Sequence, residues 1–425
     1  MLAVLVLLAI ATLVACSSSY SASSDGLVIV PNFGSAVVQA FSFSLTNGKV
    51  SRVNTAPPIP GKPVSMVLDP AGTFAYVAIQ QGSGIATYSI NSDGTLSAVG
   101  SPTTLNATNV STQYCPTQPV PAIPSTLAID SAGKFLFASD GLTGAVSVFG
   151  VSSGTLSEVP GSPFCVPTLV NGTNANLVGL AVTPTKYPVL NTQSVQNAVC
   201  SLGQPLPPST PEYLYVADAN NNVVWAFTVQ SNGVLALITN NGLLSFAADS
   251  VTTGVAVDPC NRFVFVTNNT SNNISAYAIC NTTSPARPPI CDTNQYPEGF
   301  LVQVAGSPFG LGGGTPNGPT VPAVDPLANF LYVLDYEANQ ISCFRITQVN
   351  GGLAPLSPAT VATGSHPVAI AIRGDDNWLF VANNDALSGG FGIVSQYEIT
   401  PASGVLTQFG TGIQTDNYPM AVAVK

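Results

Sequence analysis

The sequence predicts an all-β fold, a seven-bladed β-propeller built from four-stranded antiparallel blades. The first observation is a strand-like phrase that recurs along the chain, with FLYVLD at Phe330–Asp335 as its clearest copy. The second is the spacing of these copies, roughly 50 residues, which is typical of a repeat architecture. The third is that the two ends of the chain complement each other. Together they predict one ring of repeats over residues 26–425.

Each copy of the phrase is a short run of aromatic and β-branched residues, and most copies end in Asp or Asn. Such a run is typical of a buried strand that leads into a turn. The other copies are FAYVAI (Phe74–Ile79), FLFASD (Phe135–Asp140), YLYVAD (Tyr213–Asp218), FVFVTN (Phe263–Asn268), WLFVAN (Trp378–Asn383) and the degenerate VIVPN (Val28–Asn32). Counting these second strands predicts seven blades.

Three further strands complete each predicted blade. A first strand with small residues comes before the phrase, as in PVSMVLD at Pro63–Asp69, and suits a position crowded around an axis. Asp-Pro or Asp-Ser usually makes the turn between the two. A half-buried third strand follows, as in ISCFRIT at Ile341–Thr347, and then a weaker fourth strand after a Gly-containing turn. Four strands of decreasing apolarity make one blade from axis to rim.

The ends of the chain are expected to close the ring. The repeats begin at Gly26 on a second strand and end on a first strand, YPMAVAV at Tyr418–Val424. Pairing of these two strands would complete one blade and leave no exposed sheet edge. In such a ring the first strands begin, and the second strands end, on the same side, which we call the top face. The opposite side is the bottom face.

Composition excludes several classes of function. Only 7% of the 425 residues are charged, the net charge is −10, and the ten Lys plus Arg form no basic cluster. Nucleic-acid binding and attraction to an anionic membrane surface are therefore not expected. The chain has one His and no CxxC, so no metal site is expected. No GxSxG, Walker A or HExxH motif occurs, and we expect no cofactor.

The N-terminus reads as an export signal. Leu2–Leu13 is apolar apart from one Thr and suits a signal-peptide core, since it is short for a membrane span. LVAC at Leu13–Cys16 resembles the lipobox of bacterial lipoproteins, in which the Cys carries lipid after cleavage. We expect residues 1–16 to be a lipoprotein signal peptide and 17–25 a Ser-rich tether. The protein would then be exported and lipid-anchored through Cys16 in the bacterial cell envelope, at the outer membrane or periplasmic face. The alternative is an ordinary secretory signal with a chance Cys.

The other cysteines predict disulfides, which suit an exported protein. Cys115 and Cys165 fall in top-face loops of neighbouring blades and are predicted to pair. The bottom face receives four: Cys200, Cys260, Cys280 and Cys291. Four cysteines allow three connectivities. We favour Cys260–Cys280, since these two lie nearly opposite each other across a hairpin, with Cys200–Cys291 as the companion bridge. Cys343, inside a third strand, is expected to be a free buried thiol.

Candidate site residues come from the lead-in residues, defined as the residue that precedes each first strand. They are Lys62, Ile123, Asn176, Val251, Gly318 and His366, and we count with them Tyr418, which opens the last first strand. Three of them, His366, Tyr418 and Lys62, belong to consecutive blades on the top face. A His beside a Lys and a Tyr can act as a general base or hold an anion, since the imidazole pKa lies near neutrality. The alternative is that they are solvated rim residues.

Acidic candidates stand at the ends of the second strands. Asp140, Asp218 and Asp335 face the top and would either bind a ligand or cation, or serve as turn residues. Glu337 lies just past Asp335 and is the better candidate for a catalytic acid or base.

Several phrases resemble the lactonase-type seven-bladed propellers. They are GSHPVAIAI (Gly364–Ile372), NWLFVANN (Asn377–Asn384), GVLTQF (Gly404–Phe409) and the rim phrase GTLSEVPGSPF (Gly154–Phe164). That family includes a 6-phosphogluconolactonase and fungal muconate-lactonising enzymes, and it is close to the YVTN-repeat surface proteins. The resemblance extends from about Gly26 to the C-terminus. Active members carry His and Arg in the segments leading into first strands, with an acid nearby, and the resemblance implies that His366 fills such a position.

Two functions follow as hypotheses. The first is a lactone hydrolase, acting on a sugar lactone or a similar compound, with His366 and Glu337 as catalytic residues. Lys62, Tyr418, Asp335, Asp140 and Asp218 would then bind the ligand. The second is a non-catalytic binding platform for a protein or glycan at the cell surface, which the scarcity of ionisable groups and the large polar loops favour. In both hypotheses we expect a monomer that meets the membrane through its lipid alone.

Overall fold

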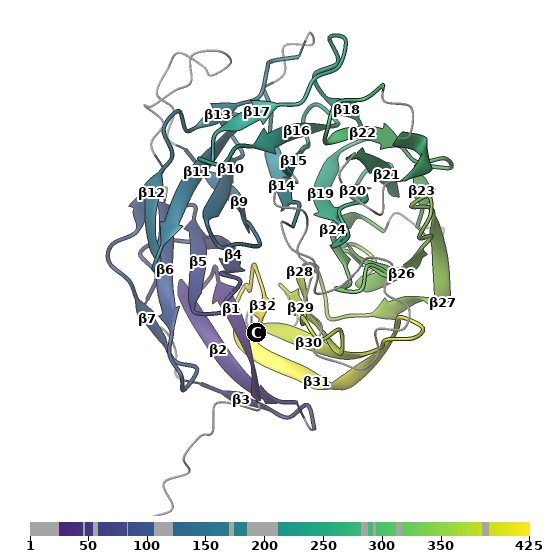
Figure 1. Cartoon of the computed structure of the whole chain (residues 1–425). Helices are drawn as coiled ribbons and strands as arrows, with labels where there is room; N and C mark the ends of the chain where they lie inside the picture. The colour runs from purple at the N-terminus through teal and green to yellow at the C-terminus, as the bar shows by residue number, and fades with distance from the viewer. Residues whose placement is uncertain are drawn as a thin grey trace, which may run out of the picture.

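Seven antiparallel sheets surround a central axis, as the repeats predict (Figure 1). The computed structural model describes residues 25–45, 47–53, 58–82, 84–105, 122–169, 174–184, 211–281, 288–291, 295–311, 317–384 and 391–425. Within these ranges one short helical segment occurs, the 3₁₀ helix η2 (Pro289–Cys291). Each sheet has four main strands that follow the chain outward from the axis, and first strands of successive blades lie side by side around it.

Equivalent strands of the blades are named together. The first strands are β4 (Pro63–Leu68), β9 (Pro124–Ile129), β14 (Leu177–Val182), β19 (Thr252–Val257), β24 (Pro319–Val324), β28 (Pro367–Ile372) and β32 (Ala423–Val424). The second strands are β1 (Asp25–Asn32), β5 (Phe74–Ile79), β10 (Phe135–Asp140), β15 (Glu212–Asp218), β20 (Phe263–Asn268), β25 (Phe330–Asp335) and β29 (Trp378–Asn383).

The outer strands are more variable in length. The third strands are β2 (Val37–Ser44), β6 (Gly84–Ile90), β11 (Ala145–Ser152), β16 (Val223–Val229), β21 (Asn273–Cys280), β26 (Gln340–Ile346) and β30 (Phe391–Thr400). The fourth strands are β3 (Val50–Arg52), β7 (Leu96–Ala98), β12 (Thr155–Glu158), β17 (Leu235–Leu237), β22 (Phe300–Gln303), β27 (Leu353–Ala362) and β31 (Val405–Asn417). Four blades add a short strand that also pairs with the third strand: β8 (Thr103–Thr104), β13 (Phe164–Cys165), β18 (Phe246–Ala247) and β23 (Phe309–Gly310).

The two ends of the chain close the ring, which confirms the predicted pairing. The antiparallel pair β1–β32 places Val28 opposite Val424 and Ile29 opposite Ala423. An isolated bridge between Asn32 and Pro419 extends the contact toward the top face. The closing blade therefore has the strand order β3-β2-β1-β32, with its innermost strand supplied by the C-terminal residues.

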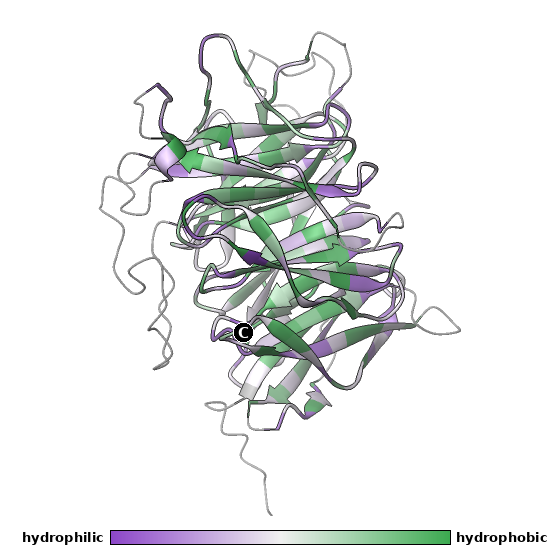
Figure 2. Cartoon of the chain, turned by 90° about the vertical axis from the view of Figure 1, so that its right-hand side faces the viewer, coloured by the Kyte–Doolittle hydropathy of each residue, from purple (hydrophilic) through white to green (hydrophobic). Residues whose placement is uncertain are grey.

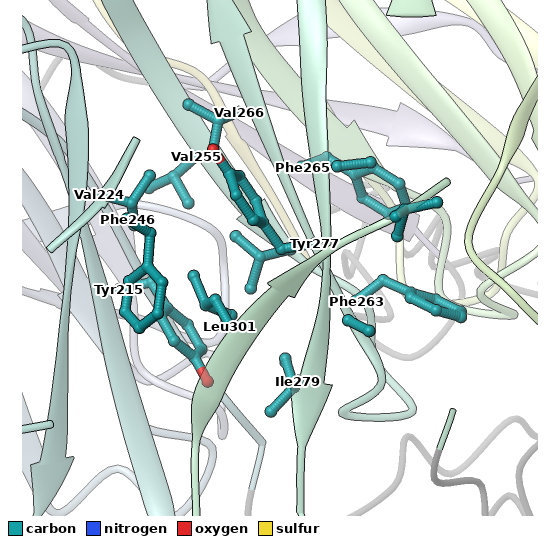
Figure 3. Close-up of a cluster of buried hydrophobic side chains, with 14 of the residues drawn as sticks. Tyr215, Val224, Phe246, Val255, Phe263, Phe265, Val266, Tyr277, Ile279 and Leu301 are labelled. Carbon is teal, nitrogen blue, oxygen red and sulfur yellow. The ribbon is translucent and has the colours of Figure 1, made fainter. Parts of the chain in front are cut away.

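The hydrophobic core lies between neighbouring sheets. Every residue of β10, β15, β20, β25 and β29 is buried, because both faces of each sheet are covered by the next blades. Figure 2 shows hydrophobic residues running along the strands in a side view. Figure 3 shows one core cluster, in which Tyr215 and Phe246 of one blade pack toward Tyr277 and Leu301 of the next. Buried aromatic and aliphatic surface of this kind is the main stabilising contribution to the fold.

A glycine–aromatic contact repeats at the blade junctions. The glycine lies in the turn between the third and fourth strands, and the aromatic residue stands at or near the start of the second strand of the preceding blade. At Gly404, where φ is 74°, an added Cβ would lie 2.4 Å from Cδ1 of Phe330. The equivalent pairs are Gly154 with Phe74, Gly233 with Phe135, Gly299 with Tyr213 and Gly351 with Phe263. The Tyr332 hydroxyl also donates a hydrogen bond to the Gly404 carbonyl at 2.8 Å. Both the left-handed backbone and the close approach require glycine.

The structure corrects the predicted bottom-face disulfides. Cys280 bonds to Cys291, with 2.06 Å between the sulfur atoms, so the predicted bridges Cys260–Cys280 and Cys200–Cys291 are wrong. The register of β20 and β21 pairs Phe263 with Ala278, which puts Cys280 across from position 261 and not from Cys260. A slip of one residue turns a side chain to the other face of a strand pair.

The remaining cysteines fit the predictions in part. Cys165 and Cys260 are both disulfide-bonded. Cys115, the predicted partner of Cys165, lies outside the described residues, as does Cys200. Cys343 is a free buried thiol, as expected, and burial raises its pKa to about 12.

The expected signal peptide and tether lie outside the described residues up to position 24, and β1 begins at Asp25. Among the described residues, no helix has the length and hydrophobicity needed to cross a membrane.

The junction contact gives a prediction for stability. Gly404→Ala should lower the free energy of unfolding by about 3 kcal/mol, because a left-handed backbone and a clash with Phe330 act together. Gly410→Ala is the matched control: Gly410 has φ 64° and no atom within 4 Å of the added Cβ, so it should cost about 1 kcal/mol. Urea unfolding of the two variants measures the difference. Equal losses would mean that the junction contact contributes nothing of its own.

Candidate functional site

The backbone conformation of the lead-in residues divides the top face into two groups of blades. Val251, Gly318, His366 and Tyr418 have left-handed backbones, with φ of 55°, 61°, 52° and 56°. The amide groups of Val251 and His366 are turned toward the preceding blade. They donate hydrogen bonds of 2.7 Å to Oδ1 of Asn222 and of Asn339, respectively. These four residues belong to consecutive blades, so they form one continuous arc.

The ends of the second strands differ accordingly. In two of the three blades whose lead-in residue is not left-handed, its amide donates to the Asp at the end of the second strand: Ile123 donates to Asp140 at 3.3 Å and Asn176 to Asp218 at 3.0 Å. In the third blade, that of Lys62, the second strand ends in Ile79. In the four left-handed blades this donor is turned away. The residue at the end of the second strand then keeps a buried Oδ1 with no hydrogen-bond partner: Asn32, Asn268, Asp335 and Asn383.

Asp140 and Asp218 hold the turns that follow them. Both are buried, with 2% and 0% of their surface exposed. Asp140 accepts hydrogen bonds from the Leu142 amide at 2.9 Å and the Thr143 hydroxyl at 2.7 Å. Asp218 accepts from the Trp225 indole at 3.1 Å. The described bonds are those of turn residues, one of the two alternatives, and a part in ligand binding stays a prediction for both.

Asp335 is different because its carboxylate is incompletely paired. Oδ2 accepts hydrogen bonds from the Ser342 hydroxyl at 2.7 Å and from Nε2 of Gln340 at 3.0 Å, while Oδ1 has no partner. Burial raises the pKa of Asp335 to about 6, against the lowering effect of these two hydrogen bonds. The carboxyl group therefore titrates close to physiological pH.

His366 lies against the turn that follows β25. Its imidazole ring is 4.8 Å from the Tyr336 ring, centre to centre, and the planes are tilted by 34°. Glu337, next in the chain, is exposed, and its amide donates a hydrogen bond of 3.1 Å to the Asn317 carbonyl. His366 is part-buried, which leaves an edge of the imidazole open on the top face.

Lys62 and Tyr418 meet at a second turn, the one that follows β1. Nζ of Lys62 donates a hydrogen bond of 3.1 Å to the Gly34 carbonyl and lies 5.4 Å from the centre of the Phe33 ring. Tyr418 is 42% exposed, and its carbonyl accepts a hydrogen bond of 2.7 Å from the Phe33 amide. The described contacts thus bring Lys62 and Tyr418 to one turn and His366 and Glu337 to another.

Two aromatic neighbours of the candidate residues, Phe33 and Tyr336, were missed in the sequence. Each directly follows the last residue of a second strand, and each lies under the lead-in residue of the next blade, Phe33 below Lys62 and Tyr336 below His366. Aligning the repeats by position would have found them, because both place an aromatic ring where other blades have residues such as Gly141 or Asn269.

A cavity of about 490 Å³ lies on the axis toward the bottom face. It is lined by the last residues of the first strands, among them Met66, Leu127, Leu180, Val257 and Ile372, and all of its lining residues are apolar. Its walls therefore carry no group for acid–base chemistry.

A second hollow of about 390 Å³ lies at the rim between the closing blade and its neighbour, beside β3 and β31. Lys49 and Arg52 line it together with Gln396, whose Nε2 is buried without a partner. In the part of the chain that the structure describes, no group of three His, Cys, Asp or Glu side chains is placed to hold a metal ion.

Asp335 gives a pH-dependent prediction. Its pKa is about 6 in the folded state and about 4 in the unfolded chain, so the folded state binds the proton more tightly. The contribution of this group to stability is then full below about pH 4 and is lost as the pH rises through 6. Asp335→Asn should raise the free energy of unfolding at pH 7.5 by about 2 kcal/mol and leave it nearly unchanged at pH 4.5.

Thermal unfolding at the two pH values measures this effect, and Asn383→Asp is the reverse variant at the equivalent position. It should destabilise the protein at pH 7.5 more than at pH 4.5. A gain from Asp335→Asn of the same size at both pH values would contradict the assignment.

The comparisons with known proteins point to one group of propellers. Residues 318–424 match the family model described as Lactonase, 7-bladed beta-propeller. The chain is 23% identical over 347 residues to the 6-phosphogluconolactonase of Yersinia pestis. This alignment covers 75% of this chain and 90% of that enzyme. The same figures hold for the Yersinia pseudotuberculosis enzyme.

Solved structures agree on the fold. A Bacteroides uniformis protein, provisionally assigned as a 6-phosphogluconolactonase, superposes with a TM-score of 0.68 at 16% identity and covers 95% of this chain and 100% of its own. The periplasmic gluconolactonase PpgL of Pseudomonas aeruginosa superposes with a TM-score of 0.64 at 15% identity, covering 94% and 99%. The chain therefore has the fold of these propellers and is similar in sequence to 6-phosphogluconolactonases.

Proposed function

We propose that the protein is a lactone hydrolase of the lactonase propeller family and that it acts at the top face. The observation that carries the proposal is the sequence identity of 23% to the Yersinia pestis 6-phosphogluconolactonase along 90% of that enzyme. A shared fold alone would not suffice, because propellers host many functions. The family match over residues 318–424 adds support, since this segment contains Glu337, His366 and Tyr418.

The proposed site spans two turns of the top face, the one after β25 with His366 and Glu337 and the one after β1 with Lys62 and Tyr418. Water adds to the carbonyl carbon of the lactone, the ring C–O bond breaks, and an open-chain hydroxy acid results. His366 takes the proton of the attacking water and returns it to the leaving ring oxygen. Lys62 stabilises the negative charge that develops on the carbonyl oxygen. Glu337, beside Tyr336, supplies a second proton acceptor at the same turn.

The substrate class that fits best is a lactone without a phosphate group. The chain has a net charge of −10, which repels an anionic substrate over long range. Two of the arginines are held away from the top face: Arg262 is buried in a salt bridge with Asp258, and Arg373 pairs with Asp375 on the bottom face. Lys62 is the lysine at the proposed site, and one cation suits a developing oxyanion better than a phosphate dianion.

The catalytic assignment is tested with His366→Asn. Asn tolerates the left-handed backbone at this position but removes the titratable imidazole, so kcat/KM for glucono-1,5-lactone should fall by about 10²–10⁴. Val251→Asn is the matched control, because Val251 has the same left-handed conformation at another lead-in position and is 38% exposed. This variant should keep full activity. Lactone opening is followed by proton release in weak buffer.

The substrate assignment is tested in the same assay with 6-phosphogluconolactone. We expect the unphosphorylated lactone to be the better substrate. If His366→Asn and Val251→Asn retain equal activity, His366 is not the base. If the wild-type protein opens no lactone of either kind, the hydrolase proposal fails.

A second candidate function is that of a binding platform for a surface protein or glycan. It is favoured by the axial cavity, which has apolar walls and no ionisable group, and by the use of Asp140 and Asp218 in turn hydrogen bonds. Under this function the protein would bind sugar lactones or glycans without turnover, and His366→Asn would change affinity and not rate.

We also propose that the protein is exported and anchored by a lipid on Cys16, and that it acts as a monomer that does not bind nucleic acid. The apolar run Leu2–Leu13 followed by LVAC supports export and the anchor, and the net charge of −10 argues against nucleic-acid binding. Radiolabelled palmitate should label the wild-type protein in a bacterial host and place it in the membrane fraction. Cys16→Ser should abolish both, while Ser18→Ala should change neither. Recovery of unlabelled wild-type protein in the soluble fraction would contradict the anchor.

A further inference from the structure

On the bottom face, a basic side chain links neighbouring blades at two junctions. Arg262, which is 1% exposed, donates from its guanidinium to the Ala328 carbonyl of the next blade at 3.4 Å. Nζ of Lys425 donates to the Gly72 carbonyl of the next blade at 2.8 Å. Ala328 and Gly72 are equivalent residues with left-handed backbones in the turn between first and second strands, with φ of 58° and 64°. A cation at this position is therefore a repeated feature of the ring.

The junction between the blade of β24–β27 and the blade of β28–β31 has the same backbone and different side chains. Asp325 stands where Asp258 stands one blade earlier, directly after the first strand. Asp376, with φ 59°, takes the place of Ala328. Asn329 replaces Arg262, so the guanidinium that binds Oδ2 of Asp258 at 2.7 Å has no counterpart.

This junction contains three buried carboxylate oxygens without partners. Oδ1 of Asp325 accepts hydrogen bonds from the amides of Asn329 and Phe330, at 2.7 and 2.6 Å, but Oδ2 has no partner. Both carboxylate oxygens of Asp376 have none. Asp325 and Asp376 are 0% and 1% exposed. Unpartnered oxygens in such a position are costly, because a buried anion needs a compensating charge or hydrogen bonds.

The equivalent junction shows that the two carboxyl groups lie at one place, because Arg262 contacts both Asp258 and Ala328, the counterparts of Asp325 and Asp376. Burial raises the pKa of Asp376 and also that of Asp325. The tyrosine of β25, Tyr332, is close enough for its own pKa to be raised by both of them after the larger effect of burial.

The basic groups around this junction are engaged elsewhere. Arg262 forms a salt bridge with Asp258, and Arg373 forms one with Asp375. Arg345 stacks over the Phe330 ring at 4.8 Å and is exposed to solvent. The described side chains therefore provide two buried carboxylates and no cation to neutralise them.

We propose that this junction binds one calcium ion between Asp325 and Asp376. Oδ2 of Asp325 and the two carboxylate oxygens of Asp376 would be ligands, with main-chain oxygen and water completing the shell. Calcium accepts six to eight oxygen ligands in irregular geometry, whereas magnesium requires a near-ideal octahedron and gives up water reluctantly. A divalent ion balances the two negative charges. It would take the place that Arg262 and Lys425 occupy at the other two junctions.

Direct binding tests the site. The mature chain with its disulfides intact is freed of metal with a chelator and titrated with calcium in a calorimeter. We expect one ion per chain, with a Kd in the range of about 10⁻⁵–10⁻³ M that is typical of extracellular modules and weak sensors. Asp376→Asn and Asp325→Asn should each abolish binding, whereas Asp375→Asn, the matched neighbour that faces Arg373, should retain it.

Stability gives an independent readout. Calcium at a hundredfold excess over Kd should raise Tm by about 3 °C, and magnesium or sodium at matched ionic strength should not. Asn329→Arg restores the residue found at the equivalent position of the preceding blade. This variant should have a raised Tm in the absence of calcium and should lose the calcium response.

Three outcomes overturn the proposal. The first is no calcium uptake by the wild-type protein up to about 10 mM, ten times the upper limit expected for Kd. The second is a Tm that rises on acidification from pH 8 to 6 without any response to calcium, which would mean that the two carboxyl groups share a proton. The third is binding that survives Asp376→Asn and Asp325→Asn, which would place the ion elsewhere.

Discussion

The packing of an aromatic side chain against a glycine at five successive blade junctions sets the geometry on which the rest of the structure depends. The aromatic residue stands at or near the start of the second strand of one blade. The glycine lies in the turn between the third and fourth strands of the next blade, as Gly404 does opposite Phe330. Because the glycine has no side chain, the two sheets approach closely enough to bury their apolar faces against each other. The same contact at successive junctions gives successive blades a similar offset, and a constant offset is what allows a ring to close.

The top face inherits its arrangement from this packing. The blades fix where the first strands begin, and the sign of φ at the lead-in residue then decides which polar atoms are used. At Asn176, where φ is not left-handed, the amide donates to Asp218 of its own blade. At His366 the amide is directed to Asn339 of the preceding blade, and the imidazole comes to lie against Tyr336. The position of the His366 imidazole is thus a consequence of the left-handed backbone at this lead-in residue.

Most of the fold could be predicted from the sequence because the second strands are buried on both faces. Runs such as Phe330–Asp335 and Trp378–Asn383 are apolar almost throughout, so the sequence shows clearly where each strand begins and ends. The structure gives both strands the same bounds. The predicted bottom-face disulfides were wrong, because they depend on finer detail. A pairing that depends on one residue of register, as between Cys260 and Cys280, needs the exact turn between the strands, which side-chain patterns do not encode.

The sequence predicts which face holds the candidate residues but not what surrounds them. His366, Lys62 and Tyr418 could be placed on the top face by counting strands. The contacts of Asp335 with Ser342, and of His366 with Tyr336, depend on the rotation of neighbouring turns. The turn between β25 and β26 contains Asn339, which has φ of 55°. Asn can adopt a left-handed backbone but also adopts others, so the sequence alone does not predict the conformation of this turn.

The closing pair has a consequence for how the molecule is made. The innermost strand of one blade is β32, and it consists of Ala423 and Val424, while its partner β1 begins at Asp25. During synthesis the early blades can pack in order, but β1 keeps an open edge until nearly the whole polypeptide has emerged. Loop closure over such a separation is slow, and an unpaired strand edge invites association with other chains. The closing blade is therefore the part of the ring most prone to such association before β32 pairs with β1.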